Sequence, residues 1–367
     1  MFIPLNAGAR ALCALALFAC FIGLPQRSAV AQSPNNQIAF HSDRDGDWDI
    51  YVMNADGSGQ RALTNNTLED RDPVWSPDGR TIAFQSRLGP NNIEIFLVNA
   101  DGSRLRNLTN HPAAEFQPAF SPDGKHLAFV SNRDKQSDIY VIDVDGKNPR
   151  RFSNNESDEW RPMWSPDGKE IAYVSGRDAG QSDGSGELYV RDARGAAPDR
   201  RLIKESRRVL FFSWSPDSAR LAYFMVAARK FEIGVADRTG ANEKNLSAVA
   251  PSSMDSEPVW SPDGRQIAFL GGTATGTMGV FVMAADGTAR RMISAADTPA
   301  TGPLSWAPDS SGVVHVETLN GNFEVVFSRT DGGTFSRLTN NPAADQAASF
   351  AWSPRARQQN PKSAVIR

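Results

Sequence analysis

The sequence has few of the residues that build covalent cross-links and many active sites. Its 367 residues include two cysteines, Cys13 and Cys20, and both lie in an N-terminal stretch that we expect to be removed. The mature chain would therefore have no disulfide, no thiolate nucleophile and no cysteine-ligated metal. Its composition, 40% hydrophobic and 22% charged, is ordinary for a globular protein, so we expect its stability to come from a buried core.

The sequence also lacks an apolar run as long as the ~20 residues that a membrane-spanning helix needs. An apolar run over 11–24 follows Arg10 and precedes a small-residue cleavage motif at 29–31. This layout predicts a cleaved secretory signal peptide over 1–31, and hence a protein that is periplasmic or secreted. An uncleaved anchor and a lipoprotein modified at Cys20 are the alternatives.

A basic stripe is absent as well. The formal net charge is −3 at pH 7, and no surface-sized cluster of lysine and arginine stands out in the sequence. Because nucleic-acid-binding proteins need such a patch to meet the phosphates, nucleic acid is not an expected partner.

What the sequence has in abundance is an internal repeat. The motif WSPDG and its variants recur with a spacing of 44 to 50 residues. The motif aromatic stands at Trp75, Phe120, Trp164, Trp214, Trp260, Trp306 and Trp352. A period in the mid-forties is typical of a four-stranded propeller blade or of a helical solenoid unit.

The local pattern distinguishes these two possibilities. Within one unit, four short segments alternate with turns, at 72–76, 81–86, 93–99 and 106–109. They are rich in β-branched and aromatic residues, and none reaches the ~10 residues of an amphipathic helix. A proline in the first segment, such as Pro73, suits the start of a strand better than a helix interior. The unit is therefore predicted to be a four-stranded blade.

Two tight turns in each unit determine which loops lie together. The sequence SPDG at 76–79 puts proline where φ is near −65° and glycine where φ is positive, and Asp101-Gly102 forms a second turn. In an antiparallel order of strands both turns fall on one face of the ring, which we call the tight-turn face. The longer loops, between the second and third strands and between successive units, fall on the opposite, long-loop face.

The two ends of the chain complement each other. The chain enters the repeat with second, third and fourth strands at 38–40, 49–54 and 62–64, and leaves with a first strand at 350–353. One blade shared between the ends closes a ring and removes exposed sheet edges, so we predict an all-β, seven-bladed propeller. The predicted domains are a signal peptide over 1–31, a short linker over 32–36, the propeller over 37–354 and a flexible tail over 355–367.

The pattern P-x-W-S-P-D-G-x-x-I-A-F-x-S-x-R, followed by D-I-Y-V-x-x-x-D-G and R-x-L-T, resembles the TolB-like PD40 (WD40-like) propeller repeat. The resemblance extends over about residues 37–354. It implies a propeller that serves as a docking platform for proteins, through its long-loop face. It does not extend to the α/β domain that precedes the propeller in TolB, so the functions of that domain are not expected here.

Residues that could carry catalysis or bind a metal are present but scattered. The motif serines recur in equivalent places without a neighbouring histidine, which indicates a structural role and not a nucleophile. The histidines occupy different positions in their repeats, which disfavours a histidine metal site. They are His41, His111, His126 and His315. The alternating acids of 43–49 (DRDGDWD) are similar to a calcium loop, but the glycine is misplaced and no downstream glutamate completes it, which favours a polar hairpin loop.

Acidic residues three positions before the first-strand proline are the strongest site candidates. Four units supply one, at Asp70, Glu115, Glu159 and Asp255. The other three units carry Val209, Thr301 and Ala347. The strand order places the acids near the ring axis on the long-loop face, where they could form an incomplete anionic collar that holds Ca²⁺ or meets a basic partner segment. Alternatively, each acid caps its own loop.

Large side chains beside these acids are candidate contacts for a partner protein. They are Arg71, Phe116, Trp160 and Arg161. Arginine and aromatic residues are the usual anchors of protein interfaces, although these could equally fill gaps between blades. We therefore expect a monomeric, non-catalytic scaffold propeller that docks an envelope or secreted protein. An enzyme that cleaves a glycan or peptide in the axial channel, and a stand-alone sensor propeller, are the alternatives.

Overall fold

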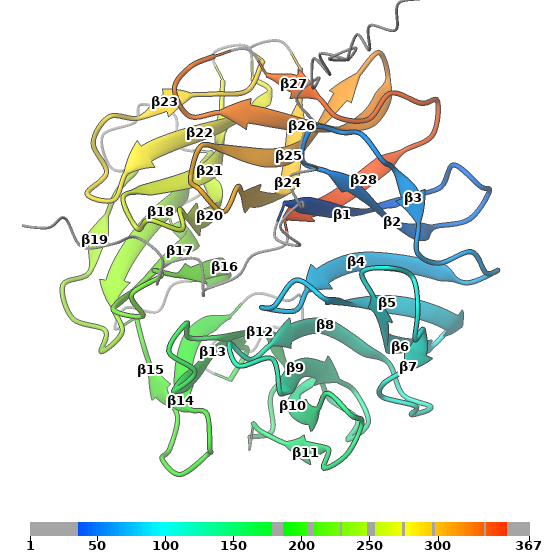
Figure 1. Ribbon diagram of the computed structural model, residues 1–367. Helices are drawn as coiled ribbons and strands as arrows, with labels where there is room; N and C mark the ends of the chain where they lie inside the picture. The colour runs from blue at the N-terminus through cyan, green and yellow to red at the C-terminus, as the bar shows by residue number, and fades with distance from the viewer. Residues whose placement is uncertain are drawn as a thin grey trace, which may run out of the picture. The chain divides into compact units, whose positions relative to one another are not determined.

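The computed structural model describes residues 36–153, 155–177, 186–203, 208–227, 230–247, 254–273, 276–295, 298–333 and 335–350. These residues form 28 β-strands in seven four-stranded antiparallel sheets, with no helix among them and thus none that could cross a membrane. Figure 1 shows the sheets following one another around a ring. The predicted seven-bladed propeller is confirmed. The predicted signal peptide and tail lie outside the described residues.

We number the blades 1 to 7 and write their strands from the ring axis outward. Blade 1 contains β28 (Asp345–Phe350), β1 (Gln37–Ser42), β2 (Asp49–Asn54) and β3 (Arg61–Ala62). Blade 2 contains β4 (Glu69–Trp75), β5 (Thr81–Gly89), β6 (Asn92–Asn99) and β7 (Arg106–Asn107). Blade 3 contains β8 (Glu115–Phe120), β9 (His126–Ser131), β10 (Asp138–Asp143) and β11 (Arg150–Arg151). Blade 4 contains β12 (Glu159–Trp164), β13 (Glu170–Ser175), β14 (Glu187–Asp192) and β15 (Arg200–Arg201).

The remaining blades repeat the same order. Blade 5 contains β16 (Arg208–Trp214), β17 (Arg220–Ala227), β18 (Lys230–Asp237) and β19 (Lys244–Asn245). Blade 6 contains β20 (Ser256–Trp260), β21 (Gln266–Gly272), β22 (Met278–Ala284) and β23 (Arg291–Met292). Blade 7 contains β24 (Ala300–Trp306), β25 (Gly312–Leu319), β26 (Asn322–Arg329) and β27 (Ser336–Arg337).

Blade 1 joins the two ends of the described chain. β28 pairs antiparallel with β1, with Ile38 opposite Phe350 and Ser42 opposite Asp345. Closure by three N-terminal strands and one C-terminal strand is therefore as predicted. The C-terminal strand begins at Asp345, earlier than the predicted 350–353. The motif marks only the part of each innermost strand that follows a bulge, so the part before it is missed.

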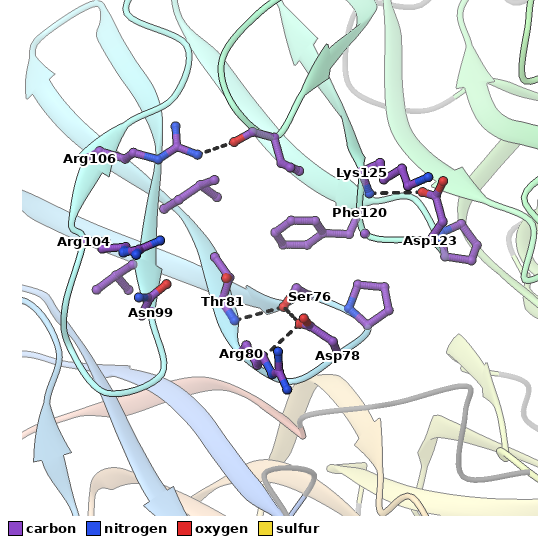
Figure 2. A pocket seen from close by; sticks show the side chains of 16 residues that line it. Ser76, Asp78, Arg80, Thr81, Asn99, Arg104, Arg106, Phe120, Asp123 and Lys125 are labelled. Carbon is purple, nitrogen blue, oxygen red and sulfur yellow. Dashed lines mark hydrogen bonds between the residues drawn. The ribbon is translucent and has the colours of Figure 1, made fainter.

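The SPDG turn owes its shape to its own side chains (Figure 2). Ser76 Oγ donates to Asp78 Oδ1 at 2.7 Å and accepts from the amide of Thr81 at 2.9 Å. Gly79 has φ 68°, a conformation that favours glycine. Because the serine and the aspartate are both occupied in holding the turn, the motif is structural, as the repetition predicts.

The apolar core lies between neighbouring blades. Ile50 of blade 1, for example, packs in one cluster with Trp75 and Phe84 of blade 2. The middle strands have a blade on either side, which explains why consecutive residues such as 82–84 are all fully buried. Burying one such aromatic side chain contributes about 2 kcal/mol, so the stacked blades replace the missing disulfides as the source of stability.

A polar link between blades comes from the first residue of each outermost strand. In six blades this residue is arginine or lysine, and its side chain donates a hydrogen bond to a main-chain carbonyl of the next blade. The pairs are Arg61 with Ala100, Arg106 with Val144, Arg150 with Ala193, Arg200 with Arg238, Lys244 with Asp286 and Arg291 with Thr330. The arginine of the R-x-L-T motif therefore fastens one blade to the next.

Two turns depart from SPDG, and the structure compensates for the change. Ser218 stands where the motif has glycine and adopts φ 62°, which costs a residue with a side chain ~1 kcal/mol. Its hydroxyl accepts a hydrogen bond from the amide of Asp167 in the preceding blade at 2.9 Å. Ser310 makes the same contact with the amide of Asp263 at 3.1 Å. Glycine could not form this bond, so the substitution links the two turns.

Candidate functional site

The innermost strands bend at a bulge just before the motif, and the bend changes the direction of the side chains there. In β4 the pairing with β5 shifts register between Arg71 and Val74, and Asp72 has φ 55°. Gln117, Arg161 and Glu257 occupy the same place in β8, β12 and β20, with φ values of 55°, 56° and 52°. We call these four the corner residues. A left-handed residue with a side chain is strained by ~1 kcal/mol, and such strain is common at functional sites.

The four predicted acids lie just before these corners and have no exposed surface. They are Asp70, Glu115, Glu159 and Asp255. Glu115 shows the usual surroundings: Arg133 Nη2 donates to its Oε2 at 2.9 Å, and Ser131 Oγ donates to its Oε1 at 2.9 Å. Both partners belong to the same blade as Glu115. The carboxylate therefore lies within its blade and is not open to the ring axis.

Glu159 and Asp255 are paired with arginine in the same way. Arg177 lies 2.7 Å from Glu159, and Arg290 donates to both carboxylate oxygens of Asp255 at 2.5 and 2.8 Å. Burial raises the pKa of Glu159, and the Arg177 charge opposes that rise. Burial also raises the pKa of Asp70, which no arginine approaches within ion-pair distance among the described residues.

Two of these four acids, and also Asp345 at the start of β28, accept a hydrogen bond from an asparagine four residues earlier and so close the loop that precedes them. Asn66 donates to Asp70 at 2.8 Å, and Asn155 makes the same contact with Glu159. Asn341 donates to Asp345 at 2.7 Å. These contacts correspond to the alternative that each acid caps its own loop. They place the acids as supports of the long-loop face.

Asp345 is an equivalent acid that the repeat spacing did not identify. It lies opposite Ser42, as Asp70 lies opposite Ser86 and Glu115 opposite Ser131, and Arg44 donates to it at 2.9 Å. Asn341, four residues before Asp345, could have identified it, because Asp70 and Glu159 also follow an asparagine at that spacing. The motif spacing pointed instead to Ala347, because β28 carries extra residues between the acid and the motif.

A metal site is not assembled by the described residues, among which no three His, Asp or Glu side chains gather. Three of the four acids of the DRDGDWD loop bind separate partners, and Asp47 Oδ2 is buried without one among the described residues. Asp43 accepts from the amide of Ala344, Asp45 accepts from the Tyr51 hydroxyl, and Asp49 accepts from Thr64 Oγ1. The calcium-loop resemblance thus corresponds here to a hydrogen-bonded hairpin loop.

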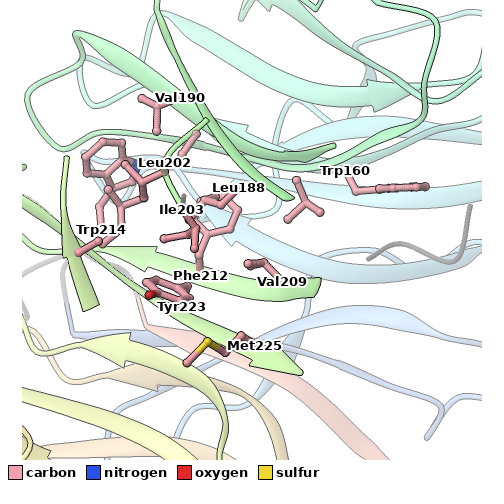
Figure 3. Close-up of a cluster of buried hydrophobic side chains, with 14 residues drawn as sticks. Trp160, Leu188, Val190, Leu202, Ile203, Val209, Phe212, Trp214, Tyr223 and Met225 are labelled. Atoms are coloured by element: carbon pink, nitrogen blue, oxygen red, sulfur yellow. The ribbon is translucent and has the colours of Figure 1, made fainter. Parts of the chain in front are cut away.

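The two predicted aromatic contacts lie largely inside the core. Trp160 is 8% exposed and belongs to a cluster with Leu188, Val209 and Met225 between blades 4 and 5 (Figure 3). Phe116 is half-buried and packs against the same cluster. Their main contacts are with neighbouring blades, so only the exposed part of Phe116 is available to a partner.

Arg71 remains accessible and is held by an aromatic ring. Its side chain is 40% exposed, and its guanidinium lies 4.4 Å from the centroid of Trp48 in the loop between β1 and β2. His41 packs edge-on against the same indole at 4.8 Å and accepts the amide hydrogen of Asp72 at its Nδ1. Trp48 is a site residue that the sequence analysis did not identify. Its place outside the repeat motif could have marked it as a residue with a role other than blade packing.

Arg161 forms a second exposed arginine–aromatic pair. Its guanidinium lies 5.4 Å from the ring centroid of Phe211 on the neighbouring β16. Burial raises the pKa of Glu257, and the positive charge of Arg161 opposes this rise. Arg161 of blade 4 and Glu257 of blade 6 therefore interact electrostatically. Gly302 of blade 7 leaves room for the Glu257 carboxylate, since a Cβ there would lie 1.9 Å from Oε2.

The two buried histidines are poor candidates for proton transfer. Burial lowers the pKa of His41 to about 3 and of His315 to about 4, so both are neutral at pH 7 and neither is placed to shuttle protons with solvent. Exposed arginines beside aromatic rings are typical of the centre of protein interfaces. The candidate site is therefore the set Trp48, Arg71, Arg161, Phe211 and Glu257.

Comparison with known proteins agrees with this fold. The sequence profile of the TolB beta propeller domain (PD40) matches residues 89–183 and 171–359. The Tol-Pal system protein TolB of Rhizorhabdus wittichii strain RW1 is 49% identical over 39 residues. This match covers 11% of this chain and 9% of that protein.

Solved structures with different activities share the propeller. TolB from Acinetobacter baumannii superposes with a TM-score of 0.57 at 17% identity, covering 88% of this chain and 68% of that one. An oligogalacturonate lyase in complex with manganese superposes with a TM-score of 0.66 at 13% identity, covering 81% of this chain and 87% of that one. At these identities the likeness concerns the fold alone.

Proposed function

Because the chain belongs to the TolB β-propeller family, we propose that it is a non-catalytic protein-binding propeller of the bacterial envelope, which docks a partner on its long-loop face. Its place is the periplasm or the outside of the cell, in keeping with the signal-peptide pattern of residues 1–31. The partner is an envelope or secreted protein.

The observation that carries this proposal is the pair of exposed arginines on aromatic rings. Arg71 lies on Trp48 and Arg161 lies on Phe211, both at the innermost strands. The ring beneath each guanidinium restricts its motion, so less conformational entropy is lost when a partner binds. The guanidinium groups keep donors that can meet carboxylates or carbonyls of a partner.

The buried acids have a supporting role in this proposal. Glu115, Glu159 and Asp255 each form an ion pair with an arginine of the same blade. The arginines are Arg133, Arg177 and Arg290, and these ion pairs hold the ends of the long loops. A preorganised loop face binds with a smaller entropic penalty than a mobile one. The acids would then influence docking through position and not through contact.

The direct test is affinity capture from an envelope extract with two matched variants. Arg161→Ser removes an exposed guanidinium on the long-loop face, and Arg265→Ser removes an exposed one from an SPDG turn on the tight-turn face. A partner identified by mass spectrometry should be recovered equally by wild type and Arg265→Ser, and at least about fivefold less by Arg161→Ser, as expected for an interface anchor. Equal recovery by all three proteins would refute docking at this site.

An enzyme remains the competing function, since the lyase shares the fold. Incubation of the purified protein with oligogalacturonate plus Mn²⁺, and separately with a peptide library, checks this. Turnover that disappears in the Glu257→Gln variant would replace the docking proposal with a catalytic one.

A further inference from the structure

The tight-turn face has a groove of its own between blades 2 and 3, away from the proposed docking site. Its volume is about 770 Å³. It runs between the SPDG turns at Asp78 and Asp123 and the outer strands of blade 2, with the ring of Phe120 standing among the lining side chains (Figure 2). No part of the proposed function uses this groove.

The groove coincides with a departure from the repeat. Phe120 occupies a motif position where the other six units have tryptophan. In three units the indole bridges blades, as where Trp214 Nε1 donates to the carbonyl of Met163 at 3.3 Å and Trp306 Nε1 to that of Val259 at 2.9 Å. The indole nitrogens of Trp164 and Trp260 make no such bond among the described residues. Phenylalanine is smaller and has no N–H group, so it makes no such bridge.

The corresponding groove between blades 3 and 4 shows what tryptophan changes. There Trp164 stacks with His126 at a centroid distance of 6.3 Å, and the volume is about 470 Å³. In the first groove Thr81 takes the place of His126, so neither large ring is present. The larger groove is thus the one with smaller side chains at these two equivalent positions.

The rim of the groove is cationic. Arg80, Arg104 and Lys125 are exposed, and none of them forms an ion pair among the described residues. Asp78 and Asp123 keep their negative charges while accepting from Ser76 and Ser121, but the lining cations outnumber these two carboxylates. A chain with net charge −3 thus presents a local excess of positive charge here.

The floor of the groove is apolar. The side chains of Leu97 of β6, which is 3% exposed, and of the half-buried Phe120 of blade 3 line it and belong to one core cluster. The side chain of Val98 points to the other face of the sheet and packs against blade 1. Arg106 adds a further positive charge to the lining, although its guanidinium is held in place by a hydrogen bond to the carbonyl of Val144. An apolar floor between cationic rims selects ligands with one large apolar group and flanking negative charges.

We propose that this groove binds an acidic peptide segment. One aromatic or aliphatic side chain of the segment is seated against Phe120 and Leu97. The carboxylates on either side of it pair with Arg80, Arg104 and Lys125 at the rim. The charge complementarity and the volume, which is large enough for one bulky side chain, are the grounds for this choice.

The test uses a fluorescein-labelled peptide with one phenylalanine between glutamates (EEFEE) and measures fluorescence anisotropy. Wild type should bind it in a salt-sensitive manner, and Phe120→Trp should bind it at least about tenfold more weakly, because the indole fills the groove. Tryptophan is the residue of the other units, so this variant should fold, and its thermal unfolding checks that it does.

Paired charge variants make the test independent of Phe120. Lys125→Ser together with Arg104→Ser should also weaken binding, whereas Lys169→Ser, at the equivalent turn of blade 4, should leave it unchanged. Three results would overturn the proposal: no binding of EEFEE to wild type, equal binding of EEAEE, or equal binding of KKFKK. Equal binding of EEAEE would mean that the groove attracts anions without an apolar anchor.

Discussion

Glu115→Gln gives a quantitative test of the buried acids. Burial raises the pKa of Glu115 to about 7, with Arg133 opposing the rise, and the side chain has no exposed surface. The shift from 4.5 to about 7 corresponds to roughly 3 kcal/mol between the charged and neutral forms. Glutamine has the same shape, can still accept from Ser131, and cannot ionise.

The sign of the effect follows from proton linkage. The pKa of Glu115 is higher in the folded than in the unfolded chain, so the folded protein binds this proton more tightly. Its contribution to the free energy of unfolding is fully present below pH 4.5 and is lost as the pH rises through about 7. The stability of wild type relative to Glu115→Gln should therefore fall by roughly 2 kcal/mol between pH 5 and pH 8.

Urea unfolding of both proteins at the two pH values measures this difference directly. Carboxyl groups that do not interact with Glu115 titrate equally in wild type and variant, so their contributions cancel. Glu94, whose charge helps to raise the pKa of Glu115, is the exception. Gln117→Asn, a neutral change two residues along β8, should differ from wild type by the same amount at both pH values. A wild-type advantage that stays constant or grows from pH 5 to pH 8 would refute the assignment of a raised pKa to Glu115.

Three further changes probe the scaffold, each by urea unfolding. Trp160→Ala should lower the free energy of unfolding by about 3–5 kcal/mol, because it leaves a cavity between blades 4 and 5; a loss below about 1 kcal/mol would contradict its place in the core. Arg150→Ala should cost about 1 kcal/mol by removing the bond to the Ala193 carbonyl, and no loss would mean that this link is dispensable. Ser218→Gly should change stability by less than about 0.5 kcal/mol, since relief of the positive φ offsets the lost bond to Asp167; a large change of either sign would show that one term dominates.

The repeat made the fold predictable from the sequence. The tight turns, the proline at the start of the first strand and the complementary chain ends together determine the number of blades, the strand order and the closure. The strand limits in blade 2 agree within about three residues: 72–76 was predicted where β4 spans Glu69–Trp75, and 93–99 where β6 spans Asn92–Asn99. The turn chemistry of 76–79 needed no tertiary information, because its hydrogen bonds are local.

The candidate site was less predictable, because its geometry depends on a bulge that the sequence does not mark. Asp72 and Arg161 adopt positive φ without being glycine. The bend at these residues sets the direction of the neighbouring side chains, toward the ring axis or toward the blade interior. Asp70, two residues before the bend in β4, points into the interior and is buried. Likewise, the pairing of Arg71 with Trp48 joins blades 2 and 1 through a contact that no repeat position encodes.

Photo-crosslinking in living cells tests the central claim most directly. A photoreactive amino acid replaces Arg161 on the long-loop face in one strain and Arg265 on the tight-turn face in another. Docking on the long-loop face predicts a discrete protein adduct at position 161 and none at position 265. The same adduct at both positions, or none at position 161, would contradict it.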